Sequence, residues 1–209
     1  LDNLTERKLI YGEKGLYNEE LKYLQEGLKI SEELGDKLSI AITLSAIGNS
    51  YLNIGRYKES LDFNNRAISF IEEINIGRWS SYLLKNIGET KYEMGNYKGA
   101  IKSLETAYNI RNKLKLAPFY LLPLLTVYYL VKKILEQDFD IKEINSLINK
   151  VKHTNYKTNY HLYELLEDIT YLNTAYQQTQ NMADAMEEDV AAKFLSYPIP
   201  KAIVEEWEK

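Results

Sequence analysis

Apolar residues recur along this chain at the spacing of an α-helix. Between residues 42 and 51, four small or apolar residues separated by three, one and three positions fall on one helical face; they are Leu44, Ile47, Gly48 and Tyr51. A second stripe covers residues 61–71. Gly55 lies between the two, where a glycine suits the left-handed conformation that ends many helices. The pattern therefore predicts a pair of helices joined by a tight turn.

The same helix pair recurs every 40 residues. Three Gly-x-Tyr turns begin at Gly15, Gly55 and Gly95, and Ile47-Gly48 has its counterpart in Ile87-Gly88. A glycine inside a helix costs about 1 kcal/mol relative to alanine. We therefore expect Gly48 and Gly88 to lie where two helices cross too closely for a side chain.

These repeats resemble tetratricopeptide repeats (TPR), in the longer variety with a 40-residue period. The family signature stands as Ala46-Ile47-Gly48-Asn49 and again as Asn86-Ile87-Gly88-Glu89, each followed by a Gly-x-Tyr turn. The first repeat departs from it, because Arg7 and Lys8 occupy the places of the apolar residue and the glycine. Terminal repeats are usually atypical. The resemblance implies an all-α fold, a right-handed superhelical solenoid of antiparallel helix pairs.

Helical periodicity continues beyond the clear repeats. We predict three TPR-like repeats in residues 1–116, a fourth, degenerate hairpin in 117–155, and a fifth hairpin with a C-terminal capping helix in 156–209. A break is expected at residues 155–159. The helices expected after residue 116 are 119–136, 141–151, 160–178, 182–195 and 201–208, with Asp140 and Asn181 as N-caps.

Stacked helix pairs curve so that the first helix of each pair lines a concave face. Along that face, positions off the packing stripe carry amides, aromatic rings and scattered charges. Asparagine can donate to and accept from a peptide backbone, and aromatic rings add contact area at low entropic cost. The alternative is that the asparagines satisfy neighbouring backbone groups. The predicted peptide-binding groove consists of Ser45, Asn49, Asn53, Tyr82, Lys85, Asn86, Glu89, Tyr129 and Lys132.

The resemblance also bears on the ligand. Some TPR domains clamp the C-terminal carboxylate of chaperones with lysines, asparagines and an arginine. Asn49 and Asn86 match the asparagines, but Ser45, Leu122 and Thr126 stand where the cations belong, so a chaperone co-factor is not expected. Relatives with longer repeats bind internal or extended peptides, or sense signalling peptides.

We therefore expect a non-enzymatic module that binds a peptide or protein segment. The alternative is a peptide-sensing regulatory domain of a larger signalling protein, such as a kinase, cyclase or transcription regulator. The start at Leu1, without an initiator methionine, favours a piece of a larger protein. An enzyme is the weakest of the three hypotheses, because no catalytic constellation supports it.

Composition excludes several kinds of chemistry. The chain has no cysteine, so it has no thiolate metal site and no cysteine nucleophile. A net charge of -4 gives no electrostatic drive toward nucleic acid or anionic membranes. The two histidines, His153 and His161, lack the frame of a metal or general-base site, and we expect both to be ordinary exposed residues. We predict no catalytic residue, metal or cofactor.

The longest apolar stretch, residues 116–131, is interrupted by Pro118 and Pro123. It falls short of the roughly 20 apolar residues that span a membrane, so we expect a buried helix. The absence of a signal sequence and of cysteine favours the cytoplasm. A protein or peptide ligand is the expected partner, with no nucleic acid and no membrane, and the C-terminal helices are the predicted site of homodimerisation.

Overall fold

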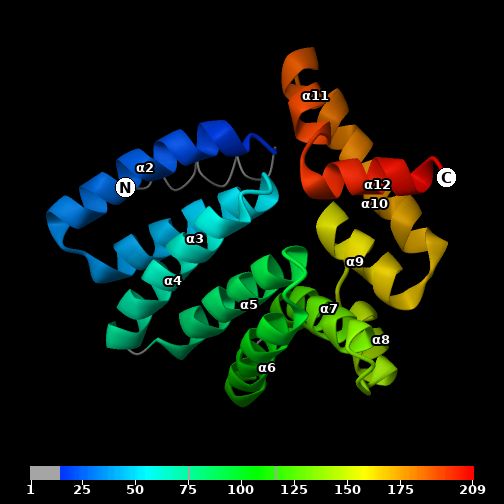
Figure 1. Cartoon of the computed structure of the whole chain (residues 1–209), viewed down its shortest axis with the longest axis horizontal. Helices are drawn as coiled ribbons and strands as arrows, with labels where there is room; N and C mark the ends of the chain where they lie inside the picture. The colour runs from blue at the N-terminus through cyan, green and yellow to red at the C-terminus, as the bar shows by residue number, and fades with distance from the viewer. Residues whose placement is uncertain (1–14, 75, 116) are drawn as a thin grey trace.

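The structure is a computed structural model that describes residues 15–74, 76–115 and 117–209, and these residues form helices without any strand (Figure 1). The first helix expected for the N-terminal repeat lies outside the described residues. The described helices are α2 (Tyr17–Leu34), α3 (Lys37–Asn53), α4 (Tyr57–Ile74), α5 (Gly77–Glu93), α6 (Tyr97–Leu114), α7 (Pro118–Ile134), α8 (Ile141–Ile148), α9 (Tyr156–Leu166), α10 (Ile169–Asp184), α11 (Glu188–Leu195) and α12 (Pro198–Trp207).

The repeat turns and the close helix crossings are confirmed. Gly55 and Gly95 have φ values of 81° and 74°, the left-handed region that ends α3 and α5. A Cβ atom at Gly88 would lie 2.6 Å from Cγ of Leu104 on α6, and one at Gly48 would overlap the side-chain amide of Asn64 on α4. The glycines therefore set how closely α3 packs on α4 and α5 on α6.

The apolar stretch forms α7, which begins at Pro118 and is buried from Leu124 to Val131. It packs into a core with residues of α6, α8 and α9. Among the described helices, α7 included, we find none with the length and apolar character of a membrane-spanning segment. Asp140 caps α8 as predicted, since its carboxylate accepts a hydrogen bond from the Lys142 amide at 2.8 Å.

Three sequence-based boundaries in the C-terminal part are wrong. The expected helix 160–178 is two helices, because the chain reverses at Glu167, whose φ is 58°, and Asp168 caps α10. The expected break at 155–159 is occupied by the start of α9, which Asn155 caps by accepting from the Thr158 amide. Asn181 lies inside α10 and caps no helix, and the expected helix 182–195 is interrupted between the end of α10 at Asp184 and the start of α11 at Glu188. The division into 1–116, 117–155 and 156–209 stays a prediction.

The helix pairs follow one another in an arc, and the C-terminal helices return toward the N-terminal end of α2 (Figure 1). A second core joins the two ends: Tyr17 of α2 packs in one cluster with Tyr156, Phe194 and Tyr197. The Asn18 amide donates to the Tyr197 hydroxyl at 3.1 Å. The two ends of the described chain are therefore in direct contact.

Candidate functional site

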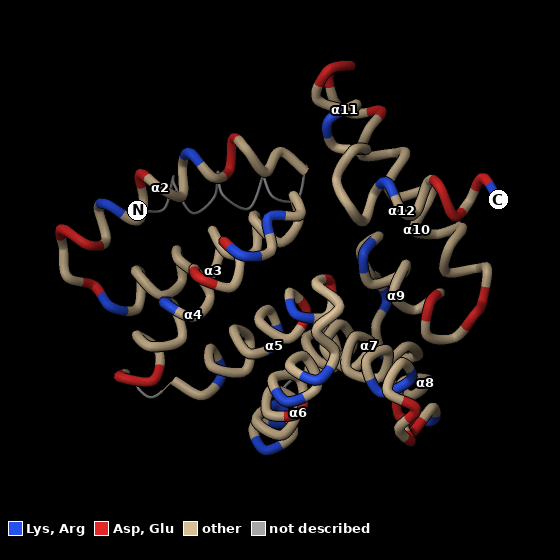
Figure 2. Tube along the Cα trace, viewed as in Figure 1, with Lys and Arg blue, Asp and Glu red and all other residues tan. Residues whose placement is uncertain are grey.

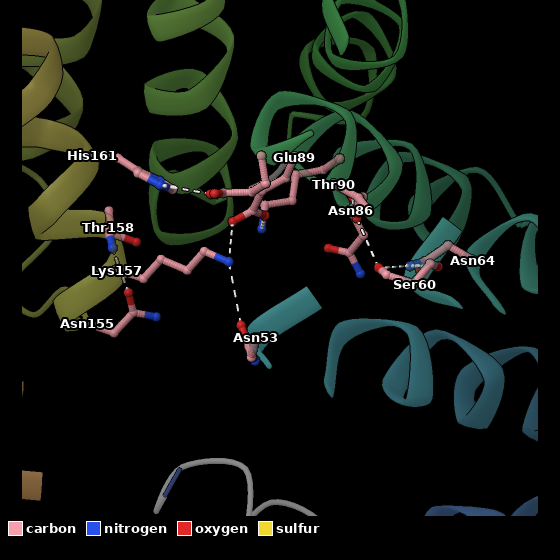
Figure 3. A network of polar contacts seen from close by, with 12 residues as sticks. Asn53, Ser60, Asn64, Asn86, Glu89, Thr90, Asn155, Lys157, Thr158 and His161 are labelled. Atoms are coloured by element: carbon pink, nitrogen blue, oxygen red, sulfur yellow. Dashed lines mark hydrogen bonds and ion pairs between the residues drawn. The ribbon is translucent and has the colours of Figure 1, made fainter. Parts of the chain in front are cut away.

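A buried ion network lies where α5 meets α9. Glu89 of α5 is only 2% exposed. One oxygen, Oε2, pairs with Lys85 from the preceding turn of the same helix, and the other, Oε1, lies 2.8 Å from Nζ of Lys157 on α9 (Figure 3). Lys157 also donates to Oδ1 of Asn53, at the end of α3, at 3.5 Å. The network thus connects two successive repeats with a helix outside them.

The two lysines respond differently to burial. Burial by itself would raise the pKa of Glu89, but Lys157 and Lys85 outweigh it and hold that pKa well below its usual range. Burial lowers the pKa of Lys85, and Glu89 only partly opposes this. Lys157 is affected by both Glu89 and Glu93, which together overcome burial and raise its pKa. Lys157 is therefore the ammonium that the carboxylates stabilise more strongly.

The polar cluster continues toward the end of α5. His161 of α9 is 2% exposed, and its Nε2 lies 3.6 Å from Oε1 of Glu93. Its ring also meets Tyr92 edge to face, and the Tyr92 hydroxyl donates to Glu164 at 3.5 Å. Burial raises the pKa of Glu164. The expectation that both histidines are exposed is wrong for His161, because α9 brings it against α5, whereas His153 is exposed.

Neutral polar groups occupy the neighbouring positions of α3 and α5. Ser45 and Asn86 are buried, and neither Oγ of Ser45 nor either amide atom of Asn86 has a hydrogen-bond partner within 3.5 Å among the described residues. Burial raises the pKa of Tyr82, and the nearby Asn86 amide opposes that rise. Asn49 is half-buried and makes no hydrogen bond within the described part of the chain. Neither asparagine side chain therefore satisfies a backbone group there, contrary to the alternative.

The remaining two predicted groove residues, Tyr129 and Lys132, lie outside the ion network. The hydroxyl of Tyr129, a buried residue, donates to Glu143 of α8 at 2.5 Å. The Lys132 ammonium lies over the ring of Tyr128, 5.4 Å from its centre. The structure thus brings Asn53, Lys85 and Glu89 into one network, and places Tyr129 and Lys132 in contacts with α8 and within α7. That any of the nine residues binds a peptide stays a prediction.

The sequence did not lead us to predict two members of the network. Lys157 and His161 belong to α9, whose first residues were expected to form a break. The available signal was Asn155, a good N-cap residue directly before Tyr156 and three residues before Thr158. In the part of the chain that the structure describes, no three or more His, Asp or Glu side chains are grouped so that they could hold a metal ion.

No protein-family model matches this chain, and no curated protein does. Two solved structures of nearly identical TPR-like repeats are similar to it, both of a protein assigned as a kinesin light chain of Podosopora anserina. One has a TM-score of 0.58 at 14% identity and covers 93% of this chain and 94% of its own. The other has a TM-score of 0.56 at 14% identity, over 100% and 97%.

At this identity the similarity concerns the fold alone. The agreement of the helix pairs, the glycine turns and these structural neighbours shows that the chain has a TPR-like repeat fold, an all-α solenoid.

Proposed function

We propose that the chain is a non-enzymatic interaction module that holds a segment of a partner protein against the inward faces of α3 and α5. The observation that carries this proposal is unused hydrogen-bonding capacity. Asn49 and Ser45 present amide and hydroxyl groups that have no hydrogen-bond partner within 3.5 Å in the described residues, and the buried Asn86 amide is shared there only with the Tyr82 hydroxyl. A peptide backbone offers donors and acceptors in alternation, which an asparagine amide can match.

The charged side chains on this face pair with one another, which favours recognition of a ligand through hydrogen bonds. Lys85, Glu89 and Lys157 pair with one another, so they contribute little long-range attraction. A buried polar group without a partner costs about 1 to 3 kcal/mol, which a bound segment would recover by supplying one. Asn49 is only half-buried, so it is the one of these three side chains that a bound segment can reach from solvent. A cytoplasmic location, a homodimer through the C-terminal helices and the absence of nucleic-acid and membrane partners belong to the same proposal.

A peptide-sensing regulatory domain is the second candidate, and the contact between the two ends of the chain favours it. Tyr17 and Asn18 of α2 bond directly to Tyr156 and Tyr197. A segment bound between these ends would change the distance between them, and that change would reach any domain attached to either end. Hydrogen exchange at α2 and α12 that slows or accelerates on ligand binding would support this candidate, whereas unchanged exchange would remove it.

Peptides selected from a random display library against the wild-type protein provide the test. Asn49→Ala should weaken their binding by about tenfold, since 1.4 kcal/mol corresponds to one decade in Kd. Asn109→Ala, which removes the same group from the exposed outer side of α6, is the matched control and should leave Kd unchanged. Equal affinity of both variants for every selected peptide would place the interaction elsewhere on the molecule.

A further inference from the structure

Lys157 is a cation in an unfavourable part of its own helix. It is the second residue of α9, and the first turn of a helix carries the positive end of the helix dipole. Its side chain is also largely buried, with 16% exposed. The ammonium is stable there because acceptors from two repeats surround it: Oε1 of Glu89 at 2.8 Å and Oδ1 of Asn53 at 3.5 Å.

The charges of α5 favour a cation at this place. Glu89 and Glu93 are both acidic, and Lys85 supplies one positive charge, to Oε2 of Glu89. Lys157 supplies a second positive charge, to Oε1 of Glu89. The site is thus built from α3, α5 and α9.

A second observation indicates that the site has unfilled capacity. Asn86 lies one turn before Glu89 on α5, is 0% exposed, and neither atom of its amide has a hydrogen-bond partner within 3.5 Å among the described residues. Figure 3 shows the Asn86 side chain between Lys157 and Ser60, closer in this view to Ser60. Lys157 reaches Glu89 but offers the Asn86 amide nothing. An extended segment that brings both a cation and a backbone amide could satisfy both groups.

We propose that Glu89 and Asn53 form a cation site that Lys157 fills in the free protein, and that a lysine or arginine of a bound protein segment fills in its place. The part of this inference that concerns a bound protein segment rests on the proposed function. Displacement requires only the Lys157 side chain to move toward solvent. The α9 backbone stays anchored, since Leu162 and Leu165 are buried in the core that contains α7.

Lys157→Ala, which leaves the site without its ammonium, allows a direct test with n-butylammonium chloride as the probe. Millimolar n-butylammonium should raise the Tm of this variant, and n-butanol, which has the same length without the charge, should not. The rise should vanish in Lys157→Ala combined with Glu89→Gln. Lys201→Ala, which removes an exposed lysine 3.6 Å from Glu205, is the control and should show no rescue. Equal effects of both probes on Lys157→Ala would overturn the cation site.

The pentapeptide acetyl-Gly-Gly-Lys-Gly-Gly-amide extends the test to a protein segment. It should bind Lys157→Ala about tenfold or more tightly than the wild type, because an intramolecular competitor acts at an effective concentration in the millimolar range. The norleucine analogue should bind neither protein. Tighter binding of the lysine peptide to the wild type than to Lys157→Ala would contradict displacement.

The wild-type protein gives an independent measurement if Lys157→Ala does not fold. Titration with the lysine peptide should shift the NMR signal of the Lys157 side chain toward that of a solvent-exposed lysine, and an unchanged signal at saturation would overturn the proposal. The two proposals can be refuted independently. If n-butylammonium does not raise the Tm of Lys157→Ala, the cation site alone is refuted. If Asn49→Ala does not weaken binding of the selected peptides, the proposed binding of a segment to α3 and α5 is refuted.

Discussion

The hydroxyl groups of Tyr17 and Tyr156 lie 3.0 Å apart in the interior, although 139 residues separate them in the chain. Each hydroxyl is the partner of the other, and the contact fixes α2, the first described helix, to the start of α9. The rings of Tyr17 and Tyr197 add an aromatic contact with centres 5.6 Å apart. A solenoid usually joins only neighbouring repeats, so this pair gives the fold a long-range connection.

Tyr17→Phe should destabilise the protein by about 1 to 3 kcal/mol, because it leaves the Tyr156 hydroxyl buried without its partner. Tyr17→Phe combined with Tyr156→Phe should cost less than the sum of the single changes. Urea unfolding measures both. Tyr171→Phe, which removes a hydroxyl without a hydrogen bond in the described structure, should have almost no effect. Additive costs for the Tyr17 and Tyr156 changes would show that the two hydroxyls do not interact.

Gly88→Ala should destabilise the protein even though alanine favours a helix. The propensity gain is about 1 kcal/mol, but the new Cβ would lie 2.6 Å from Leu104 Cγ and 3.3 Å from its backbone nitrogen, and overpacking of this kind costs about 1 to 3 kcal/mol. Gly27→Ala on α2 is the control, because no atom lies within 4 Å of its Cβ position, and it should stabilise. An equal rise in the unfolding temperature of both variants would refute close packing at Gly88.

Glu89→Gln should cost about 3 kcal/mol, because it leaves Lys85 and Lys157 largely buried without a full negative charge between them. The pKa of Glu89 is lowered in the folded state, so its contribution is fully present above the unfolded pKa of about 4.3 and is lost progressively as pH falls from that value toward the lowered pKa. The variant should therefore show a flatter loss of stability in acid than the wild type.

Glu73→Gln removes a carboxylate from an exposed pair with Lys37 and is the control for Glu89. Exposed pairs contribute about 0 to 1 kcal/mol, so its effect should be small at every pH. Chemical denaturation between pH 3 and pH 7 compares the two variants. A Glu89→Gln protein with wild-type stability across that range would mean that the network does not stabilise the fold.

Glu164→Gln should have the opposite effect at neutral pH. Burial raises the pKa of Glu164, so the folded protein binds its proton more tightly than the unfolded chain does. Its contribution to stability is therefore present at low pH and is lost as pH rises through the raised pKa. The neutral glutamine removes this cost, and the variant should be more stable than the wild type at pH 7 but not at pH 4. If the wild type were more stable than the variant at pH 7, the expected direction of the effect would be wrong.

The sequence by itself determined the repeat. The 40-residue period, the turns at Gly55 and Gly95 and the close crossings at Gly48 and Gly88 all follow from local rules, since helix periodicity and the left-handed conformation of glycine act within a few residues. The same rules failed at Glu167 and Asp168, because the apolar spacing from Leu162 to Leu172 continues across a reversal of the chain.

Only the tertiary structure decided what lies against the inner face. The pairing of Glu89 with Lys157 joins residues far apart in the sequence, and no local pattern specifies it; it depends on how α9 packs against α7. Burial of His161 against α5 follows from the same packing. Helical spacing gives the face on which a side chain lies, but the return of the C-terminal helices determines whether that face meets water or another part of the chain.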